Sequence, residues 1–365
     1  MAGGAVWFDF ENTPHVLFLE PLLRSVQAAG WDTVATAKPQ SQTLELANAR
    51  GLTFDAVGEG NVKGRVQKVF FGLSRAAKLA AWAIQRGRPR LLISSSRSAC
   101  VAARWLGIPA VGLLDYEHSE HRPFSMSCRP VLLPDLLSDA ELDPDLRRAA
   151  QFFEGLKENL YIDSRGLDRQ EARAAIGLSN GSCVVVARPP ASNAHYADRA
   201  EESTALWLRI VRDLQAGDDS KIYLLPRDQE QFEWLYELFD GTPRVHLFPT
   251  VLDGPALVAA ADLVVSGGGT MNREAAALGV PAWSVFTGAT PHIDACLERE
   301  GRLRWIRNQA ELEAAQAAPA PTLLPRRGPY PLGFTMIMEA IIAHLNLPER
   351  KRMREPVESP VEVFD

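Results

Sequence analysis

Short apolar runs alternate along this chain with longer stretches of helical periodicity, and the alternation restarts in the second half. Strands that are apolar at nearly every position are buried on both faces, and the helices between them provide the cover. This pattern is typical of βαβ units on parallel sheets, so it predicts an α/β fold. The expected strands span residues 6–10, 33–37, 53–57, 91–94, 110–114 and 131–133, and then 183–187, 222–225, 245–248, 263–265 and 282–285.

Two runs of strands in 365 residues indicate two domains, because a single hydrophobic core rarely grows to this size. We expect a Rossmann-like N-terminal domain over residues 1–160 and a Rossmann-like C-terminal domain over 161–330, with a polar linker near 156–176. Ligands of such sheets bind beyond the carboxyl ends of the strands, so a cleft between the two domains is the expected site. The tail at 348–365 is charged and interrupted by prolines, which predicts poor order.

The composition argues against several classes of protein. Lys plus Arg number 39 and Asp plus Glu 45, so the net charge of −6 argues against nucleic acid as a partner. The four cysteines form no C-x-x-C pair, which argues against a disulfide framework or a zinc finger and favours a reducing cytoplasm. Asp9 and Glu11 precede any long apolar run, so neither a signal peptide nor a membrane span is expected.

The segment ADLVVSGGGTMNREAAALGVP is the most informative in the sequence. An expected strand runs into a serine and three glycines, and a helix rich in alanine follows at once. Glycines let the backbone pass close to a ligand, and a helix start presents unpaired N–H groups and a partial positive charge. Such a turn suits a diphosphate. The predicted diphosphate-binding residues are Ser266, Gly267, Gly268, Gly269 and Thr270.

Glu274 lies about one turn inside the helix that follows the glycines. From this position its carboxylate can accept hydrogen bonds from the two hydroxyls of a ribose. The alternative is a strand-to-helix turn that needs glycine only for tight packing, with Glu274 complementing the helix dipole.

The glycine segment resembles the nucleotide-sugar site of the GT-B superfamily, which includes the UDP-GlcNAc 2-epimerases and the UDP-GlcNAc transferase of peptidoglycan lipid synthesis. In those families a Ser/Gly-rich turn contacts the diphosphate, and a helix Glu, matched here by Glu274, binds the ribose. The wider chain resembles an uncharacterised bacterial and archaeal family of GT-B-like proteins over residues 7–288. The matching stretches are FDFENTPHVLFLEPLL, SRSACVAARWLGIPAVGLLDYEH, VVVARPPASNAHYA, LLPRDQEQ and SGGGTMNREAAALGVP. The resemblance implies a GT-B fold whose last helix, at 334–347, crosses back to the N-terminal domain.

The loop after the first strand carries a candidate base. Thr13 suits a helix N-cap and Pro14 the first helical position, which places His15 in the first turn. A histidine titrates near neutral pH and is the usual general base. In the resembling transferase a His of the matching loop faces the acceptor, which implies the same role for His15. A structural His that caps the turn is the alternative.

Five ionisable residues in seven follow the expected strand at 110–114, in the stretch DYEHSEH. Neighbouring charges push pKa values apart, as acid–base chemistry requires, so Asp115, Glu117 and His118 are candidate catalytic residues. In the resembling epimerases an acidic residue of the matching segment belongs to the active site, but this sequence departs from their V-E-A-G-L-R pattern. A metal site at His118 and His121 is disfavoured, because H-x-x-H in a loop is not a diagnostic zinc spacing. A solvated loop is the remaining alternative.

Two arginines follow expected strands of the C-terminal domain, namely Arg188 and Arg227. A guanidinium binds a phosphate through two parallel hydrogen bonds, so both are candidate diphosphate ligands. No acidic metal triad is visible near the glycines, which favours metal-independent stabilisation of the leaving group, as in GT-B enzymes generally. Surface ion pairing is the alternative. Weaker candidates are Asn193, His195 and Tyr196, and a second anion site at Ser95, Ser96 and Arg97.

The segment from Lys63 to Arg90 has eight basic residues and no acidic one. On a helical wheel one apolar stripe is expected to face the core, while the opposite side mixes apolar rings with cations. That mixture predicts a weak contact with a membrane surface or lipid carrier; a homodimer contact or packing against the flanking loop is the alternative. The expected core stripe is Val66, Phe70, Leu73, Ala77, Ala80 and Ile84, and the expected outer residues are Phe71, Leu79 and Trp82 with Lys68, Arg75, Lys78 and Arg86.

Together these features predict a cytoplasmic, metal-independent glycosyltransferase, peripheral to the inner face of the membrane if the basic helix binds lipid. Its substrate would be a nucleotide-sugar, in particular a UDP-sugar, with no further cofactor, and its acceptor is left open. The alternatives are a UDP-sugar 2-epimerase or hydrolase, and a non-catalytic nucleotide-sugar-binding protein, because a fold does not determine a reaction.

Overall fold

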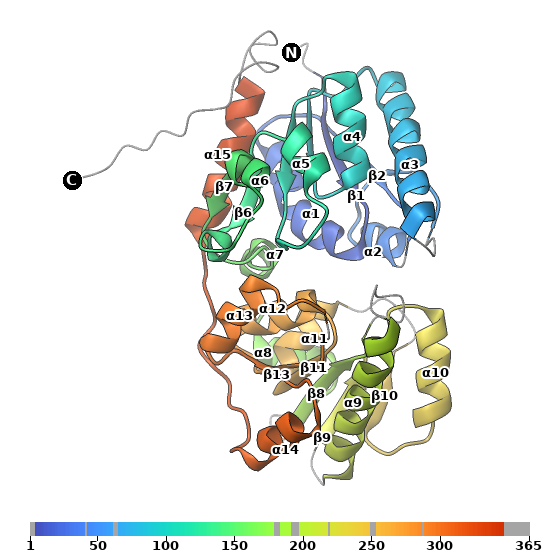
Figure 1. Cartoon of the computed structure of the whole chain (residues 1–365), viewed down its shortest axis with the longest axis vertical. Helices are drawn as coiled ribbons and strands as arrows, with labels where there is room; N and C mark the ends of the chain where they lie inside the picture. The colour runs from blue at the N-terminus through green and yellow to red at the C-terminus, as the bar shows by residue number, and fades with distance from the viewer. Residues whose placement is uncertain are drawn as a thin grey trace, which may run out of the picture. The chain divides into compact units, whose positions relative to one another are not determined.

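The computed structural model describes residues 4–40, 42–60, 65–178, 183–190, 197–217, 220–248, 253–286 and 288–346. The expectations for Asn193, His195, Tyr196 and the tail at 348–365 lie outside these residues. The chain divides into two compact units (Figure 1). The first unit comprises Met1–Glu154 and Pro331–Asp365, and the second comprises Gly155–Tyr330.

The first unit is built on a seven-stranded sheet in the order β3-β2-β1-β4-β5-β6-β7, with every neighbouring pair parallel. Strand β1 is buried at all five positions, which explains its continuous run of Val, Trp and Phe around a single Asp. The strand order reverses between β1 and β4, which is the position where ligands of open parallel sheets bind. The strands are β1 Val6–Phe10, β2 Thr33–Ala37, β3 Asp55–Ala56, β4 Leu91–Ser94, β5 Ala110–Leu113, β6 Val131–Pro134 and β7 Ala150–Phe153.

Helices cover both faces of this sheet (Figure 1). The last of them, α15, comes from the far end of the chain and packs on β7. Its Gly333 approaches the backbone of Glu154 so closely that an added Cβ would lie 2.0 Å from the Glu154 carbonyl oxygen. The helices of the first unit are α1 Thr13–Ala28, α2 Thr43–Ala49, α3 Arg65–Gln85, α4 Arg97–Leu106, α5 Arg122–Ser127, α6 Pro144–Ala149 and α15 Pro331–Asn346, with a 3-10 turn at Asp135–Leu137.

The second unit has a six-stranded parallel sheet in the order β10-β9-β8-β11-β12-β13, and here the order reverses between β8 and β11. One core cluster, centred on Trp207 and Trp283, joins the sheet to the helices. The strands are β8 Cys183–Arg188, β9 Ser220–Leu224, β10 Val245–Leu247, β11 Leu263–Ser266, β12 Ala282–Ser284 and β13 Leu303–Trp305. The helices are α7 Asn159–Arg165, α8 Arg169–Ala175, α9 Ala197–Ala216, α10 Gln229–Phe239, α11 Gly254–Ala260, α12 Gly269–Leu278, α13 His292–Arg299 and α14 Gln309–Ala317.

The predicted linker at 156–176 is wrong, because α7 and α8 occupy most of it and belong to the second unit. A capping signal was present in the sequence: the Asp168 side chain accepts hydrogen bonds from the amides of Gln170 and Glu171. Strands β7 and β13 and helices α5, α6 and α14 are also absent from the sequence prediction. The strands have only four and three residues, too few for a period to be recognised.

Helix α3 faces the core with the opposite side from the one predicted. Arg75 and Leu79, expected on the outside, are buried. The reason is that Arg75 forms an ion pair with Asp9 inside the unit. The Arg75 side chain is 3% exposed and the Asp9 side chain is 0% exposed, and this buried pair turns the Arg75 side of the helix inward. In the expected core stripe, the exposed residues are Phe70, Leu73, Ala77 and Ile84.

Cys100 and Cys128 lie together in the first unit although they are distant in the sequence. Their Sγ atoms are 3.5 Å apart and both residues are fully buried free thiols. Burial, together with Cys128, raises the pKa of the Cys100 thiol well above its usual range. The pair is therefore part of the buried core of the first unit.

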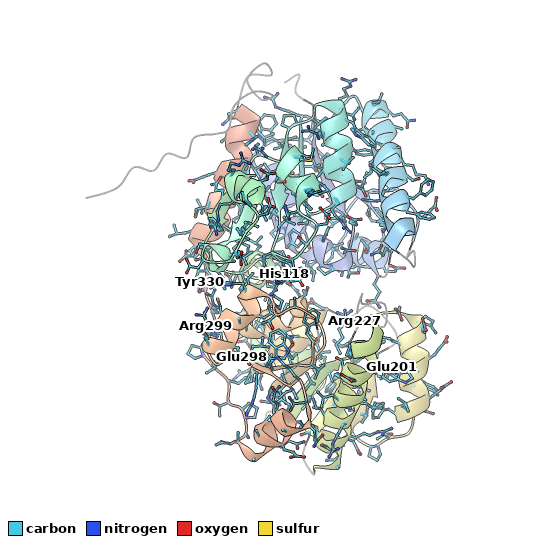
Figure 2. The ribbon with its side chains drawn as sticks, viewed as in Figure 1. His118, Glu201, Arg227, Glu298, Arg299 and Tyr330 are labelled. Atoms are coloured by element: carbon cyan, nitrogen blue, oxygen red, sulfur yellow. The ribbon has the colours of Figure 1, made fainter. Side chains whose placement is uncertain are left out.

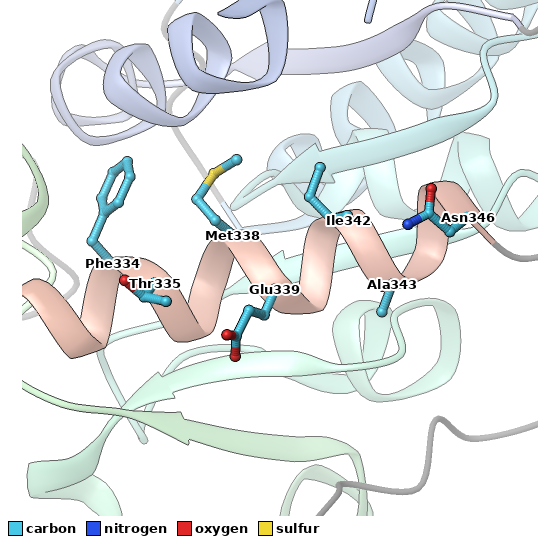
Figure 3. A pocket seen from close by; sticks show the side chains of 7 residues that line it. All are labelled: Phe334, Thr335, Met338, Glu339, Ile342, Ala343 and Asn346. Atoms are coloured by element: carbon cyan, nitrogen blue, oxygen red, sulfur yellow. The ribbon is translucent and has the colours of Figure 1, made fainter. Parts of the chain in front are cut away.

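A shallow depression runs along the outer face of α15 (Figure 3). Among the described residues its lining is mostly apolar and includes Phe334, Met338 and Ile342. Within the described ranges, no helix combines the length and hydropathy that a membrane span requires.

Candidate functional site

The candidate site of the second unit lies at the point where its strand order reverses. Arg188 ends β8, and it is the register partner of Ser266, which ends β11. From Ser266 the chain passes through Gly267 and Gly268 directly into α12. Ligands of open parallel sheets bind at such a reversal, so the glycine loop stands where the topology itself favours a site.

Only some of the backbone amides that were predicted to bind the diphosphate are available to a ligand. The Gly267 amide donates to the Arg188 carbonyl at 3.3 Å, and the Gly268 amide donates to Ser266 Oγ at 3.1 Å. Helix α12 then starts with Gly268 as an N-cap that makes no side-chain hydrogen bond. The first helical amides, from Gly269 and Thr270, thus lie at a partly exposed and uncapped helix start. The amides without a partner in the loop therefore begin at residue 269 rather than 267.

Two of the three glycines lie so close to other residues that an added Cβ would clash. A Cβ on Gly267 would lie 2.6 Å from Pro190 Cα, and a Cβ on Gly268 would lie 2.5 Å from Arg227 Nη2. A Cβ on Gly269 would meet nothing closer than 3.7 Å. The first contact is with backbone, whereas the second is with the end of a flexible side chain that reaches over the loop.

This difference predicts opposite phenotypes for two neighbouring substitutions. Gly267→Ala should lower the unfolding free energy by about 1–3 kcal/mol, because the backbone at Pro190 cannot move aside without strain. Gly268→Ala should leave stability nearly unchanged but weaken nucleotide binding, because it displaces the Arg227 guanidinium. Urea unfolding and calorimetric titration with UDP measure the two effects, and Gly269→Ala is the matched control. Equal stability of the first two variants would contradict the contact geometry.

Arg188 and Arg227 bring positive charge to the loop. Arg227 follows β9 in the second unit (Figure 2), and its Nε donates to the Pro189 carbonyl at 3.1 Å. Arg188 Nε is buried without a hydrogen-bond partner. Burial, and then repulsion from Arg188, lowers the pKa of Arg227 to about 9. In the described residues neither guanidinium forms an ion pair with a carboxylate within bonding distance. An anion would relieve this repulsion.

Sequence reasoning missed Arg273, which also lies near the loop. Its guanidinium carbon would be 3.7 Å from a Cβ on Gly269. Unlike the other two arginines it is neutralised, because its Nε donates to Asp294 Oδ1 at 2.8 Å and both side chains are buried. The sequence N-R-E at 272–274 did not indicate this ion pair, because the partner of Arg273, Asp294, lies on the next helix.

Glu274 is buried in the second unit and accepts a hydrogen bond of 2.6 Å from the hydroxyl of Tyr161. Burial raises the pKa of Glu274 to about 7, and the charge of Glu158 adds to this, while Tyr161 and Arg188 act in the opposite direction. Near neutral pH the carboxyl group is therefore divided between its protonated and ionised forms. Either form has oxygen acceptors for ribose hydroxyls.

The raised pKa predicts a pH-dependent stability. The folded protein holds this proton up to pH 7, whereas the unfolded chain loses it near 4.5. Between these values the folded state binds more protons, so the unfolding free energy falls as the pH rises. Glu274→Gln removes this titration and keeps an acceptor for Tyr161. The variant should match the parent near pH 5 and exceed its unfolding free energy by about 3 kcal/mol above about pH 8.

Urea unfolding at the two pH values measures the difference. Glu230→Gln, on an exposed carboxyl of the same unit, is the control and should show no such trend. A difference between Glu274→Gln and the parent protein that stays constant with pH would show that Glu274 is ionised throughout.

In the first unit, His15 lies in the first turn of α1 and is buried. Helix α1 begins one residue earlier than predicted, with Asn12 at the N-cap and Thr13 as the first helical residue. The Glu11 amide donates to His15 Nδ1 at 3.3 Å, and the ring packs on Phe18. With Nδ1 accepting, the neutral ring carries its proton on Nε2.

The two histidines after β5 pair with different carboxylates, one in the same loop and one at the start of α6. His118 Nε2 lies 3.5 Å from Glu117 Oε1, and His121 Nε2 lies 3.4 Å from Asp143 Oδ1. Glu117 is almost buried, with 5% of its side chain exposed, whereas His118 is open to solvent (Figure 2). Asp115 is partly buried at the start of the loop. The two histidines thus have different partners, and no three potential ligands cluster for a metal among the described residues.

A buried ion pair joins Arg75 of α3 to Asp9 near the carboxyl end of β1. Arg75 donates from Nη1 to Asp9 Oδ2 and from Nη2 to Asp9 Oδ1, at 3.0 and 2.7 Å, and Nη1 also donates to Ser96 Oγ. Burial alone would lower the pKa of Arg75, but attraction and hydrogen bonding to Asp9 raise it overall. Ser95 Oγ donates to the Leu113 carbonyl. The two serines of the predicted second anion site therefore have structural partners, and Arg97 alone remains exposed.

Comparison with known proteins identifies the family. Residues 5–312 match the family model described as "Protein of unknown function (DUF354)". The chain belongs to this family. The DUF354 chain is 26% identical over 315 residues to Uncharacterized protein MJ0665 of Methanocaldococcus jannaschii, an alignment that covers 82% of this chain and 86% of that protein. The resemblance to a GT-B-like family of unassigned function is confirmed.

Solved structures share the fold of this DUF354 protein over nearly its whole length. The UDP-GlcNAc 2-epimerase from Neisseria meningitidis, bound to UDP-GlcNAc, matches with a TM-score of 0.69 at 13% identity, covering 93% of this chain and 99% of that one. The glycotransferase of kitacinnamycin matches with a TM-score of 0.57 at 15% identity, covering 94% and 96%. Identities this low establish the fold, which is of GT-B type with two parallel-sheet α/β units, as predicted.

Proposed function

We propose that the second unit binds a nucleoside diphosphate sugar, with the diphosphate at the start of α12 between Arg188 and Arg227. One observation carries this proposal: two guanidinium groups without a carboxylate partner converge on an uncapped helix start where the strand order reverses. Surface ion pairing, the alternative use of these arginines, is disfavoured by their burial and by the absence of partners in the described residues.

We infer that the reaction is glycosyl transfer. Cleavage of the bond between the sugar and the diphosphate leaves negative charge on the phosphate oxygens, and the two arginines and the α12 amides would stabilise it electrostatically. No step requires a metal in this scheme. Glu274 would accept hydrogen bonds from the ribose, and His15 or a carboxylate at Asp115 or Glu117 would assist the acceptor hydroxyl. UDP is the nucleotide we favour, because the Neisseria meningitidis neighbour holds UDP-GlcNAc.

A sugar-nucleotide 2-epimerase or hydrolase is the second candidate. The observation in its favour is the larger structural similarity to the epimerase than to the glycotransferase. Glu117, nearly buried beside His118, would then act as one member of an acid–base pair.

Incubation with UDP-sugars separates the candidates. Release of UDP only after an acceptor is added, and equally in the presence of a chelator, supports the transferase. UDP or an epimerised sugar formed without an acceptor supports the second candidate. Tight binding of UDP in calorimetry without turnover would indicate a binding protein, and absence of any UDP binding would overturn the site.

A further inference from the structure

The outer layer of the first unit exposes an unusual set of large apolar side chains. Among the described residues five of the nine exposed ones lie on α3, α4 and α5, which contact one another in that order. Figure 1 shows these three helices side by side. The five are Phe70 (69% exposed), Leu73 (50%), Ile84 (53%), Trp105 (54%) and Met126 (55%). We call this surface the α3–α5 face.

The segment that carries α3 and α4 is basic. Residues 65–106 contain nine Lys or Arg and no acidic residue, in a chain whose net charge is −6. Arg75 forms the buried ion pair with Asp9 and is not available to a partner. Lys78 pairs with Glu59, and Arg86 pairs with Asp55. The latter two pairs are solvent-exposed, and such pairs contribute little free energy and dissociate readily.

The cations around Trp105 and Met126 remain available. Arg104 donates to the Met126 carbonyl and Arg129 to the Ser125 carbonyl, both at 2.6 Å. Both side chains are exposed, and neither forms an ion pair with a carboxylate in the described residues. Among the described residues, no carboxylate therefore neutralises their charge beside Trp105 and Met126.

The charge decides between the possible partners of this face. A symmetric contact between two copies would place the same patch against itself, and here it would bring cations against cations. An anionic lipid surface satisfies both features, since apolar side chains enter the interface while Lys and Arg remain at the headgroups. We propose that the α3–α5 face binds the surface of a membrane that carries anionic lipids.

The residues proposed to contact the membrane differ from those that the sequence pattern predicted. The sequence pattern assigned it to Phe71, Leu79 and Trp82, but Leu79 is buried and the Trp82 indole donates to Asp55. The residues that the pattern assigned to the core, Phe70 and Ile84 among them, are the ones that face outward.

Co-sedimentation of the full chain with vesicles tests the proposal. The protein should bind vesicles of phosphatidylglycerol and phosphatidylcholine in equal parts, bind pure phosphatidylcholine poorly, and dissociate as salt is raised. The triple variant Phe70→Ser, Leu73→Ser, Ile84→Ser should partition at least about tenfold less, because three apolar anchors are lost. Arg104→Glu with Arg129→Glu should reduce binding to the anionic vesicles in particular.

Tyr236→Ser, which alters an exposed apolar side chain of the second unit (51% exposed), is the matched control and should bind as the parent does. Circular dichroism and the thermal shift with UDP should be unchanged in every variant, so that loss of the face is distinct from loss of the nucleotide site. Equal binding by the parent and the triple variant would overturn the proposal. So would a dimer of the parent that the triple variant dissociates while neither binds vesicles.

Discussion

The double variant Arg188→Met, Arg227→Met is expected to bind UDP roughly two to four orders of magnitude more weakly than the parent protein. Each guanidinium is expected to make a charge-assisted hydrogen bond to the diphosphate, and removal of one such bond to a charged group costs about 1.5–3 kcal/mol. That loss is roughly tenfold to a hundredfold in affinity for each arginine. Calorimetric titration with UDP measures the loss of affinity of the double variant and of each single variant.

The same double variant should be more stable than the parent in the absence of ligand. Burial and mutual repulsion lower the pKa of Arg227 to about 9, which means that the folded protein disfavours its charge even though the charge persists at neutral pH. Replacing such a group with an apolar side chain of similar length is expected to raise the unfolding free energy by about 1–2 kcal/mol. Residues that lower the stability of the protein without ligand, but are required for binding, are typical of functional sites.

Arg302→Met separates the two effects. Arg302 belongs to the same unit but pairs with Glu300 and donates to the Ala276 carbonyl. Its loss should lower stability and leave the UDP affinity unchanged. If the double variant retained the UDP affinity of the parent, the diphosphate would have to bind elsewhere and the proposed function would lose its basis.

Arg75→Met is expected to give the largest loss of stability in the first unit, about 3–5 kcal/mol of unfolding free energy. The substitution leaves the Asp9 carboxylate buried with only Thr36 to donate to it, at 2.5 Å. It also removes the hydrogen bonds from Arg75 to Ser96 and to the Val57 carbonyl. Equilibrium unfolding in urea, monitored by tryptophan fluorescence, measures the change.

Two further variants test whether the cause is the uncompensated charge. Arg75→Met combined with Asp9→Leu removes both charges and should recover part of the lost stability. Lys78→Met breaks the exposed pair with Glu59, at 48% and 57% side-chain exposure, and should cost less than about 1 kcal/mol. Similar losses from Lys78→Met and Arg75→Met would contradict the role given to burial.

The alternation of apolar runs and helical stretches was sufficient to predict both sheets, because strand burial follows from local sequence. Strands such as Val6–Phe10 and Leu91–Ser94 have the predicted bounds. Short elements such as β13 have too few residues for a period to appear. Their existence depends on neighbouring strands that lie far away in the sequence.

The face of α3 could not be predicted for a different reason. A helical wheel assigns the broadest apolar stripe to the core, yet the orientation here is determined by Arg75 and a carboxylate 66 residues earlier in the chain. In the second unit the positions of Arg188 and Arg227 after strands did predict that they lie at the same sheet edge as the glycines. That the Gly268 amide is already bonded to Ser266 Oγ depends on the shape of the turn, which composition does not determine.

The position of α15 has a consequence for how the protein is made. Strand β7 is the outermost strand of its sheet, and the helix that packs on it begins only at Pro331, after the whole of Gly155–Tyr330. At roughly 5–20 residues per second, the ribosome needs on the order of ten to thirty seconds to synthesise the intervening segment. During that interval Ala150–Phe153 lacks its covering helix while the second unit is still being synthesised. An uncovered edge strand pairs readily with strands of other chains. Where several ribosomes translate one message close together, nascent copies of this protein are therefore prone to misassembly at that edge.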